Sequence, residues 1–332
     1  MVNDWHWRNI LTASAGVALT ALLGCTSPER GPEFTLEQEE WNYRGTAGKI
    51  LKTPHFTIHT TIQDPVMVEI MPDFAEASYR RYEKLMPGGA SDRDPLRSYV
   101  FEQRRQWNQF TRDFANPRRV PIYLRIQSGG YSENAVGVLY LIGRERTLSV
   151  FAHEGFHQYV ASRFDETIPP WLNEGLACYC EAFQMDGMKP VFTPDHNTFR
   201  MNNLRTALNA KELVPLKEIL DTHAGNIIRL GGRKVASYYA QAWALVTFLR
   251  HGKNKQYVEG FRKLLDDAGT SRMRQAADAF RAASSEGDVS YGAACFRHYV
   301  CDDVETFEED YKAFLLPLVG FSSSVAVGRS DE

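Results

Sequence analysis

Short hydrophobic runs bounded by polar residues dominate the first half of the chain. Residues 55–60 (HFTIHT) alternate between polar and apolar side chains, which is typical of a half-buried β-strand. Residues 64–86 instead carry apolar residues at helical spacing, and the charged segment 102–114 also has a helical pattern. Further strands are predicted at 96–101, 120–126 and 135–142.

From Thr147 onward the apolar spacing becomes helical and mostly stays so. Thr147 is a good N-cap, so the first of these helices is predicted to begin there. A strand-rich part at 46–146 followed by a helix-rich part at 147–320 predicts an α+β fold, with a small mixed sheet before a mostly helical part. The predicted helices cover residues 147–164, 171–183, 198–210, 234–251, 255–268, 271–284 and 303–316.

Residues 1–24 are predicted to be a signal peptide. The run at 10–24 is uncharged and apolar, is too short to span a bilayer comfortably, and follows a basic residue. It leads into the sequence LLGC, which resembles the signal of bacterial lipoproteins. We therefore expect lipid on Cys25 to anchor the exported chain in a membrane, facing the periplasm or the cell surface; alternatively, the signal is cleaved and the cysteine is incidental. A tether is predicted at 25–45 and a flexible tail at 321–332.

Composition and charge narrow the classes of partner. The 332-residue chain is 43% hydrophobic and 24% charged, as is usual for soluble globular proteins. Its 38 basic and 41 acidic residues give a formal net charge of −3, so we expect no nucleic-acid partner. Besides Cys25, the chain has four cysteines, which after export permit either two disulfides or free buried thiols. They are Cys178, Cys180, Cys295 and Cys301.

The strongest chemical signal is the sequence HEGFH in the helix predicted at 147–164. Four residues advance a helix by about 400°, so His153 and His157 lie on one face, one turn apart, where both imidazoles can bind one metal ion. Glu154 lies about 100° around the helix, beside that metal rather than on it. A general base must lie there to take a proton from a metal-activated water. The sequence thus predicts one Zn²⁺ ion, with Glu154 as the base.

A catalytic zinc ion usually has three protein ligands and leaves its fourth position to water. We predict that Glu174 is the third ligand, because it lies on a second helix that begins after two prolines. Sixteen residues separate His157 from Glu174, enough for the second helix to return beside the first. Glu166 is closer in sequence, but it lies in the connection and has less support from helix packing.

The HEGFH sequence followed by WLNEGLA resembles the gluzincin metallopeptidases, in which a glutamate in an NEG context is the third zinc ligand. Residues 50–268 are most similar to a family of peptidase-MA-like bacterial lipoproteins, the DUF1570 group. The sequence YAQAWAL is similar to the gluzincin helix whose first tyrosine stabilises the tetrahedral intermediate, which makes Tyr239 the candidate oxyanion donor. The adjacent Tyr238, and Gln241-Ala242 in place of the usual Lys-Gly, depart from that pattern.

This resemblance implies a zinc-dependent peptidase acting on a peptide or protein. Zinc polarises the scissile carbonyl and acidifies a water molecule, Glu154 accepts the proton and passes it to the leaving amine, and Tyr239 hydrogen-bonds the oxyanion. The strand at 135–142 is placed like the edge strand along which these enzymes bind an extended peptide. An endopeptidase cleft is the first expectation, although Glu133-Asn134 is similar to the pair with which aminopeptidases bind a substrate amine.

Two other functions are compatible with the same zinc site. One is hydrolysis of a different amide, such as a cell-wall peptide cross-link. The other is a non-catalytic zinc-binding lipoprotein that retains the fold as a scaffold. The presence of Glu154 argues against the scaffold, because a protein that only binds has no chemical need for a carboxylate beside the metal.

Overall fold

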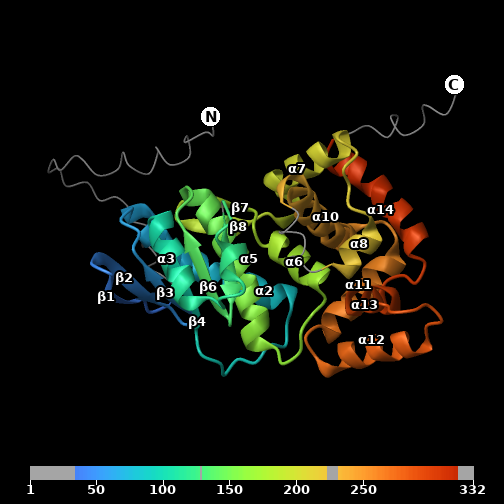
Figure 1. The fold of residues 1–332 in the computed structure, drawn as a ribbon, viewed down its shortest axis with the longest axis horizontal. Helices are drawn as coiled ribbons and strands as arrows, with labels where there is room; N and C mark the ends of the chain where they lie inside the picture. The colour runs from blue at the N-terminus through green and yellow to red at the C-terminus, as the bar shows by residue number, and fades with distance from the viewer. Residues whose placement is uncertain (1–33, 128, 223–230, 321–332) are drawn as a thin grey trace, which may run out of the picture.

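The α+β fold predicted from the sequence is confirmed by the computed structural model, shown as a ribbon in Figure 1. The structure describes residues 34–127, 129–222 and 231–320. A mixed sheet and its covering helices form one half of the molecule, and helices from later in the chain form most of the other half (Figure 1). The predicted signal peptide with Cys25, and the tail at 321–332, lie outside the described residues.

The sheet consists of β1 (Glu37–Tyr43), β2 (Thr46–Lys52), β3 (Phe56–Thr60), β4 (Leu96–Phe101), β5 (Gly130–Glu133) and β6 (Val136–Tyr140). Their order is β1-β2-β3-β4-β6-β5. β1, β2 and β3 are antiparallel neighbours, β3, β4 and β6 run parallel, and β5 pairs antiparallel with β6. The strands predicted at 55–60, 96–101 and 135–142 are therefore confirmed.

Two segments differ from the predictions. The strand predicted at 120–126 is wrong, because 120–123 form a short helix, α4 (Val120–Tyr123). Pro121 cannot donate a hydrogen bond to a sheet and fits the first turn of a helix. The tether predicted at 25–45 extends too far, because β1 begins at residue 37. This edge strand is mostly exposed and pairs with β2 through its backbone, so it lacks the hydrophobic run of a buried strand.

Helices cover both faces of the sheet, namely α2 (Pro65–Leu85), α3 (Arg104–Phe114) and α5 (Arg144–Arg163). α2 and α5 pack on one face, where Leu139 of β6 joins the main hydrophobic core. α3 packs on the other face, where Val138 joins a second cluster around Trp107. Because both faces of β6 are covered, its sequence is apolar throughout rather than alternating.

The second half of the described chain is mostly helical, as predicted. It contains α6 (Pro170–Tyr179), α7 (Thr198–Asn209), α8 (Leu216–Asp221), α10 (Gly232–His251), α11 (Lys255–Asp267), α12 (Ser271–Ala283), α13 (Tyr291–Tyr299) and α14 (Val304–Leu318). The sequence did not predict α8 and α13. Nor did it predict the hairpin between α6 and α7, formed by β7 (Phe183–Asp186) and β8 (Lys189–Phe192).

A glycine sets the distance between α6 and the long, largely buried α10. A Cβ atom at Gly175 would lie 2.6 Å from Cγ2 of Val246 and 2.8 Å from the backbone oxygen of Ala242. Only glycine allows this approach, so the glycine of the NEG sequence has a packing role. The close contact fixes the neighbouring Glu174 against the core.

The start of α5 differs from the prediction. The helix begins at Arg144, one turn before Thr147, and its N-cap is Gly143 with a φ of 97°. Glycine adopts this left-handed conformation without steric cost, so the chain turns into the helix earlier than the threonine suggests. The Thr147 hydroxyl is still used, because it accepts a hydrogen bond of 2.9 Å from the backbone N–H of Ile142.

The four cysteines within the described residues are free thiols. The alternative of two disulfides is therefore wrong, and the alternative of free thiols holds; Cys178, Cys180 and Cys295 are buried and Cys301 is partly exposed. In the described part of the chain, no helix combines the length and apolar character needed to cross a bilayer.

Candidate metal centre

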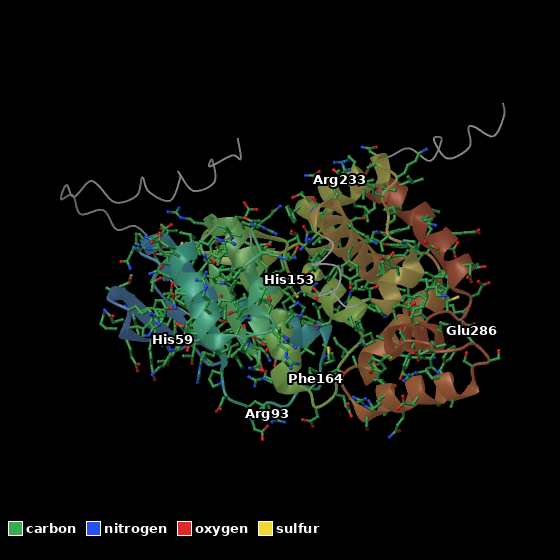
Figure 2. All side chains as sticks on the ribbon, viewed as in Figure 1. His59, Arg93, His153, Phe164, Arg233 and Glu286 are labelled. Atoms are coloured by element: carbon green, nitrogen blue, oxygen red, sulfur yellow. The ribbon has the colours of Figure 1, made fainter. Side chains whose placement is uncertain are left out.

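Two histidines lie one turn apart on α5. His153 is 8% exposed, and Figure 2 shows it near the centre of the molecule, where the sheet-bearing half meets the helices of the second half. α5 is buried on most sides, with Phe151 and Phe156 in the main core. Packing of the helix, rather than a loop, therefore holds the two imidazoles in place.

The carboxylate of Glu174 on α6 meets both imidazoles. The Nε2 atoms of His153 and His157 are 3.2 Å apart, and Oε2 of Glu174 lies 3.4 Å from the first and 3.5 Å from the second. Ligand atoms about 2.0–2.1 Å from a tetrahedral zinc ion are about 3.3 Å from one another. The three atoms already have that spacing, so this group can hold one metal ion.

The Glu174 oxygen that points at the histidines is buried and has no hydrogen-bond partner among the described residues. Burial would raise the pKa of this carboxyl, but the charge of His157 and the proximity of His153 outweigh it and hold the pKa below its usual range. A buried carboxylate oxygen without a hydrogen bond is costly unless it binds a cation. The donor set and its unsatisfied oxygen thus fit a divalent ion.

Glu166, the alternative third ligand, is not part of this group. Its carboxylate accepts a hydrogen bond of 2.7 Å from Nε of Arg274 on α12, and it lies in the connection between α5 and α6. Glu166 is thus paired with Arg274. The structure thus brings Glu174, and not Glu166, close to the two histidines.

A second layer of residues orients each imidazole. The Nδ1 atom of His153 lies 2.9 Å from Oε1 of Glu181, and that of His157 lies 3.0 Å from Oδ1 of Asn173. Both acceptors require a proton on Nδ1, which leaves the Nε2 lone pair of each ring directed at the shared point. The tautomers are thereby set for metal binding.

Glu181 is itself fixed by groups that the sequence analysis missed. Arg200 of α7 donates to both of its carboxylate oxygens, with a distance of 2.8 Å from Nε to Oε2. Asn197 donates to the same Oε2 at 3.0 Å and also caps α7. Glu181 follows the end of α6 and belongs to no recognisable motif, so only the tertiary arrangement brings it to His153.

We expect Glu181→Gln to weaken zinc binding by about ten- to a hundredfold, because the amide is a poorer orienting acceptor for His153. The measurement is zinc affinity by competition with a chelator. The change also leaves Arg200 buried without its carboxylate, so the double variant Glu181→Gln/Arg200→Gln is the matched control for that charge. Wild-type zinc affinity in a folded Glu181→Gln protein would contradict the orienting role.

A second group of potential ligands shares His153. Cys178 and Glu181 lie close enough to the Nδ1 atom of this ring to be considered with it as a metal site. However, Arg200 already occupies both oxygens of Glu181, and the Cys178 sulfur is 4.0 Å from Nδ1. Burial raises the pKa of the Cys178 thiol, so the thiolate that a metal needs is disfavoured. The group with Glu174 is the better metal site.

Glu154 is buried beside the histidines and makes no hydrogen bond to any residue that the structure describes. Burial raises the pKa of its carboxyl, while the charges of His153 and His157 oppose the shift. On the other side lies Gly130 of β5, where a Cβ atom would be 3.4 Å from Cγ of Glu154. A carboxylate without a hydrogen-bonding partner, next to the donor triad, is available to exchange protons.

The structure separates the two neighbouring tyrosines of α10. The ring of Tyr239 lies 6.0 Å from the ring of His153, and its hydroxyl makes no hydrogen bond within the described residues. Burial, together with the charge of Glu174, raises the pKa of Tyr239 well above its usual value, so its hydroxyl keeps its proton. The Tyr238 hydroxyl instead points to the backbone oxygen of Thr222, at 3.4 Å. Tyr239 is therefore the tyrosine at the site.

The edge of the sheet beside the site is β5, not the strand predicted at 135–142. β6 lies between β4 and β5, so its backbone is paired on both sides. The turn at Asn134 and Ala135, with φ angles of 51° and 58°, folds β5 back along β6. The prediction placed the edge one strand too far along the chain.

Glu133, the residue compared with the amine-binding glutamate of aminopeptidases, is bound elsewhere. Its carboxylate accepts hydrogen bonds from the backbone N–H of Asn116 at 3.2 Å and from Arg119 at 3.4 Å. Side chains alternate along a strand, so Glu133 and Gly130 lie on opposite faces of β5, and Gly130 faces Glu154. The structure therefore does not bring Glu133 to the donor triad.

Zinc binding is expected to release protons from the two histidines. Burial alone would lower the pKa of His157, but the charge of Glu174 outweighs it and raises the pKa above 6.5; the pKa of His153 is also raised. The metal-free pair therefore binds protons more readily than free imidazoles do, the ion must displace these protons, and zinc affinity should rise with pH until they are lost. Calorimetric titrations in buffers of different ionisation enthalpy measure the release, and its absence would contradict the arrangement.

Residues 147–273 match the model of a family described as a protein of unknown function (DUF1570). This match supports the resemblance to the DUF1570 group. No curated protein and no solved structure matches the chain. The matched segment contains the site residues His153, Glu154, His157, Glu174, Glu181, Arg200 and Tyr239.

Proposed function

We propose that this chain is a zinc-dependent peptidase, acting as an endopeptidase, and that His153, His157 and Glu174 hold the metal. The observation that carries the proposal is the triangle of three donor atoms, 3.2–3.5 Å apart, with a buried oxygen that lacks any other partner. Structural zinc sites usually have four protein ligands, whereas catalytic sites have three. A triad beside a carboxylate without a hydrogen bond supports hydrolysis more than a structural role.

When bound, zinc supplies a Lewis acid that polarises the scissile carbonyl and makes a water molecule more acidic. A carboxylate oxygen of Glu154 accepts the proton from the attacking water and delivers it to the nitrogen of the leaving amine. The Tyr239 hydroxyl donates a hydrogen bond to the carbonyl oxygen of the substrate as negative charge develops there. Glu181 and Asn173 keep the two imidazoles fixed during these steps.

The position of β5 at the end of the sheet supports a peptide as the substrate. Among the described residues this strand pairs with β6 on one side alone, so an extended peptide can add to the other side by backbone hydrogen bonds. Gly130 leaves room between this edge and Glu154, where a larger side chain would crowd the base. The predicted lipid on Cys25 stays a prediction, and it would hold this site at a membrane surface.

The test is cleavage of a mixed peptide library by the purified full-length protein, followed by mass spectrometry. We expect internal peptide bonds to be cleaved with one zinc ion bound per chain, and cleavage to stop after chelation and return with added zinc. Zinc binding without cleavage of any peptide would favour the scaffold function. Cleavage restricted to cell-wall peptide cross-links would favour the hydrolase of another amide.

A further inference from the structure

Arg146 shares a face of α5 with the metal-binding histidines. It precedes His153 by seven residues, a rotation of about 700°, so the two side chains point in directions only about 20° apart around the helix. Along the helix axis they are about 10 Å apart. Arg146 is only partly exposed. Its guanidinium carbon lies 4.1 Å from the centre of the Phe199 ring, which is itself 45% exposed at the start of α7.

No acidic side chain pairs with Arg146 among the described residues, and it makes no hydrogen bond to them. Glu181 is the nearby carboxylate whose charge acts on Arg146, but Arg200 occupies both of its oxygens. Burial lowers the pKa of Arg146, and the charge of Arg200 opposes its protonation further. One positive charge therefore remains unbalanced beside the metal-binding face, and a guanidinium fork is well suited to bind a carboxylate.

The direction from the metal site to Arg146 follows from how α5 lies along the β5–β6 hairpin. Gln158 contacts the backbone oxygen of Ala135 at 3.1 Å, whereas Glu154 lies beside Gly130, which pairs with Leu139. α5 therefore runs opposite to β6, and Arg146 lies beyond the Gly130 end of β5. A peptide added antiparallel to β5 runs from the Glu133 end toward the Gly130 end. Its residues after the scissile bond thus extend toward Arg146.

We propose that Arg146, held by Phe199, binds a carboxylate of the peptide substrate two or three residues after the scissile bond. An extended peptide advances about 3.3 Å per residue, so about three residues cover the distance along α5. The carboxylate is either the C-terminus of a short substrate or an acidic side chain within a longer one. This inference rests on the proposed peptidase function and names the class of substrate.

The experiment compares two sets of peptides with the zinc-loaded full-length protein. One set ends in a free acid or an amide, and the other ends in an amide and carries Glu or Gln two or three residues after the cleaved bond. A carboxylate in one set should raise kcat/KM about ten- to a hundredfold, mainly through KM. The set that responds identifies the source of the carboxylate. In the responding set, Arg146→Gln should bring kcat/KM for the peptide with the carboxylate close to kcat/KM for the peptide without it. Arg146→Lys should keep part of the difference.

Arg105→Gln is the matched control, because it removes an exposed arginine of α3 and should keep the full preference. Absence of a carboxylate preference in both sets, or a preference that survives Arg146→Gln, would overturn the proposal. A second readout does not require turnover: binding of the same labelled peptides to zinc-loaded Glu154→Gln protein, with and without Arg146→Gln. If no peptide is cleaved, the peptidase function fails. The subsite is still supported if the protein binds the peptide with the carboxylate more tightly and Arg146→Gln removes that preference. Binding that does not depend on the carboxylate would overturn it.

Discussion

Glu154→Gln is expected to lower kcat for peptide hydrolysis by about a hundred- to ten-thousandfold, the range for loss of a general base. The glutamine keeps the size of the side chain but cannot accept a proton from water. Glu154 has no hydrogen bond to any described residue, so the change breaks no visible contact that supports the fold. The measurement is the rate of peptide cleavage together with zinc content, and one zinc ion per chain should remain bound.

Glu145→Gln is the control for this substitution. Glu145 is an exposed glutamate in the first turn of the same helix, so it reports any general effect of removing a negative charge from α5. We expect the control to retain wild-type kcat. If the Glu154→Gln protein hydrolysed peptides as fast as the wild type, Glu154 would not be the base, and the mechanism proposed here would be wrong.

His157→Ala is expected to weaken zinc binding by at least about a hundredfold, because two protein ligands replace three. A hundredfold loss corresponds to about 2.7 kcal/mol of binding free energy. Since zinc stabilises only the state that binds it, the wild-type protein should melt at a higher temperature when zinc is added, and the variant should gain much less. Thermal melts with and without zinc measure this difference without any assay of activity.

His298→Ala serves as the comparison, because His298 is an exposed histidine on another helix, α13. It should gain the same stability from zinc as the wild type. If His157→Ala kept the full zinc-dependent shift in melting temperature, a different group would be holding the metal. The cluster of His153, Cys178 and Glu181 would then need to be considered.

The meeting of the three donor side chains could be predicted from the sequence in part because helical periodicity alone places His153 and His157 together. Glu174 could be predicted because two prolines mark the start of a second helix; the close packing at Gly175 became visible only in the structure. The supporting residues could not be found in this way. Glu181 and Arg200 come from a turn and from another helix, and only the tertiary packing of α6 and α7 brings them to His153.

The misplaced sheet elements have a similar explanation. β1 is held largely by backbone pairing and leaves most of its side chains in solvent, so its sequence resembles that of a tether. β5 has four residues, and its place at the edge depends on two left-handed residues, Asn134 and Ala135, that form the turn to β6. Hydrophobic periodicity detects long apolar faces, whereas β1 contributes only Trp41 and Tyr43 to the cluster around Trp107, and β5 is too short to show a period.

X-ray absorption at the zinc edge of the zinc-loaded protein tests the central claim most directly. We predict one zinc ion per chain with only nitrogen and oxygen neighbours, including two imidazoles at about 2.0–2.1 Å. A sulfur neighbour at about 2.3 Å would place the metal at Cys178 instead. That result, or the absence of stoichiometric zinc, would contradict the site formed by His153, His157 and Glu174.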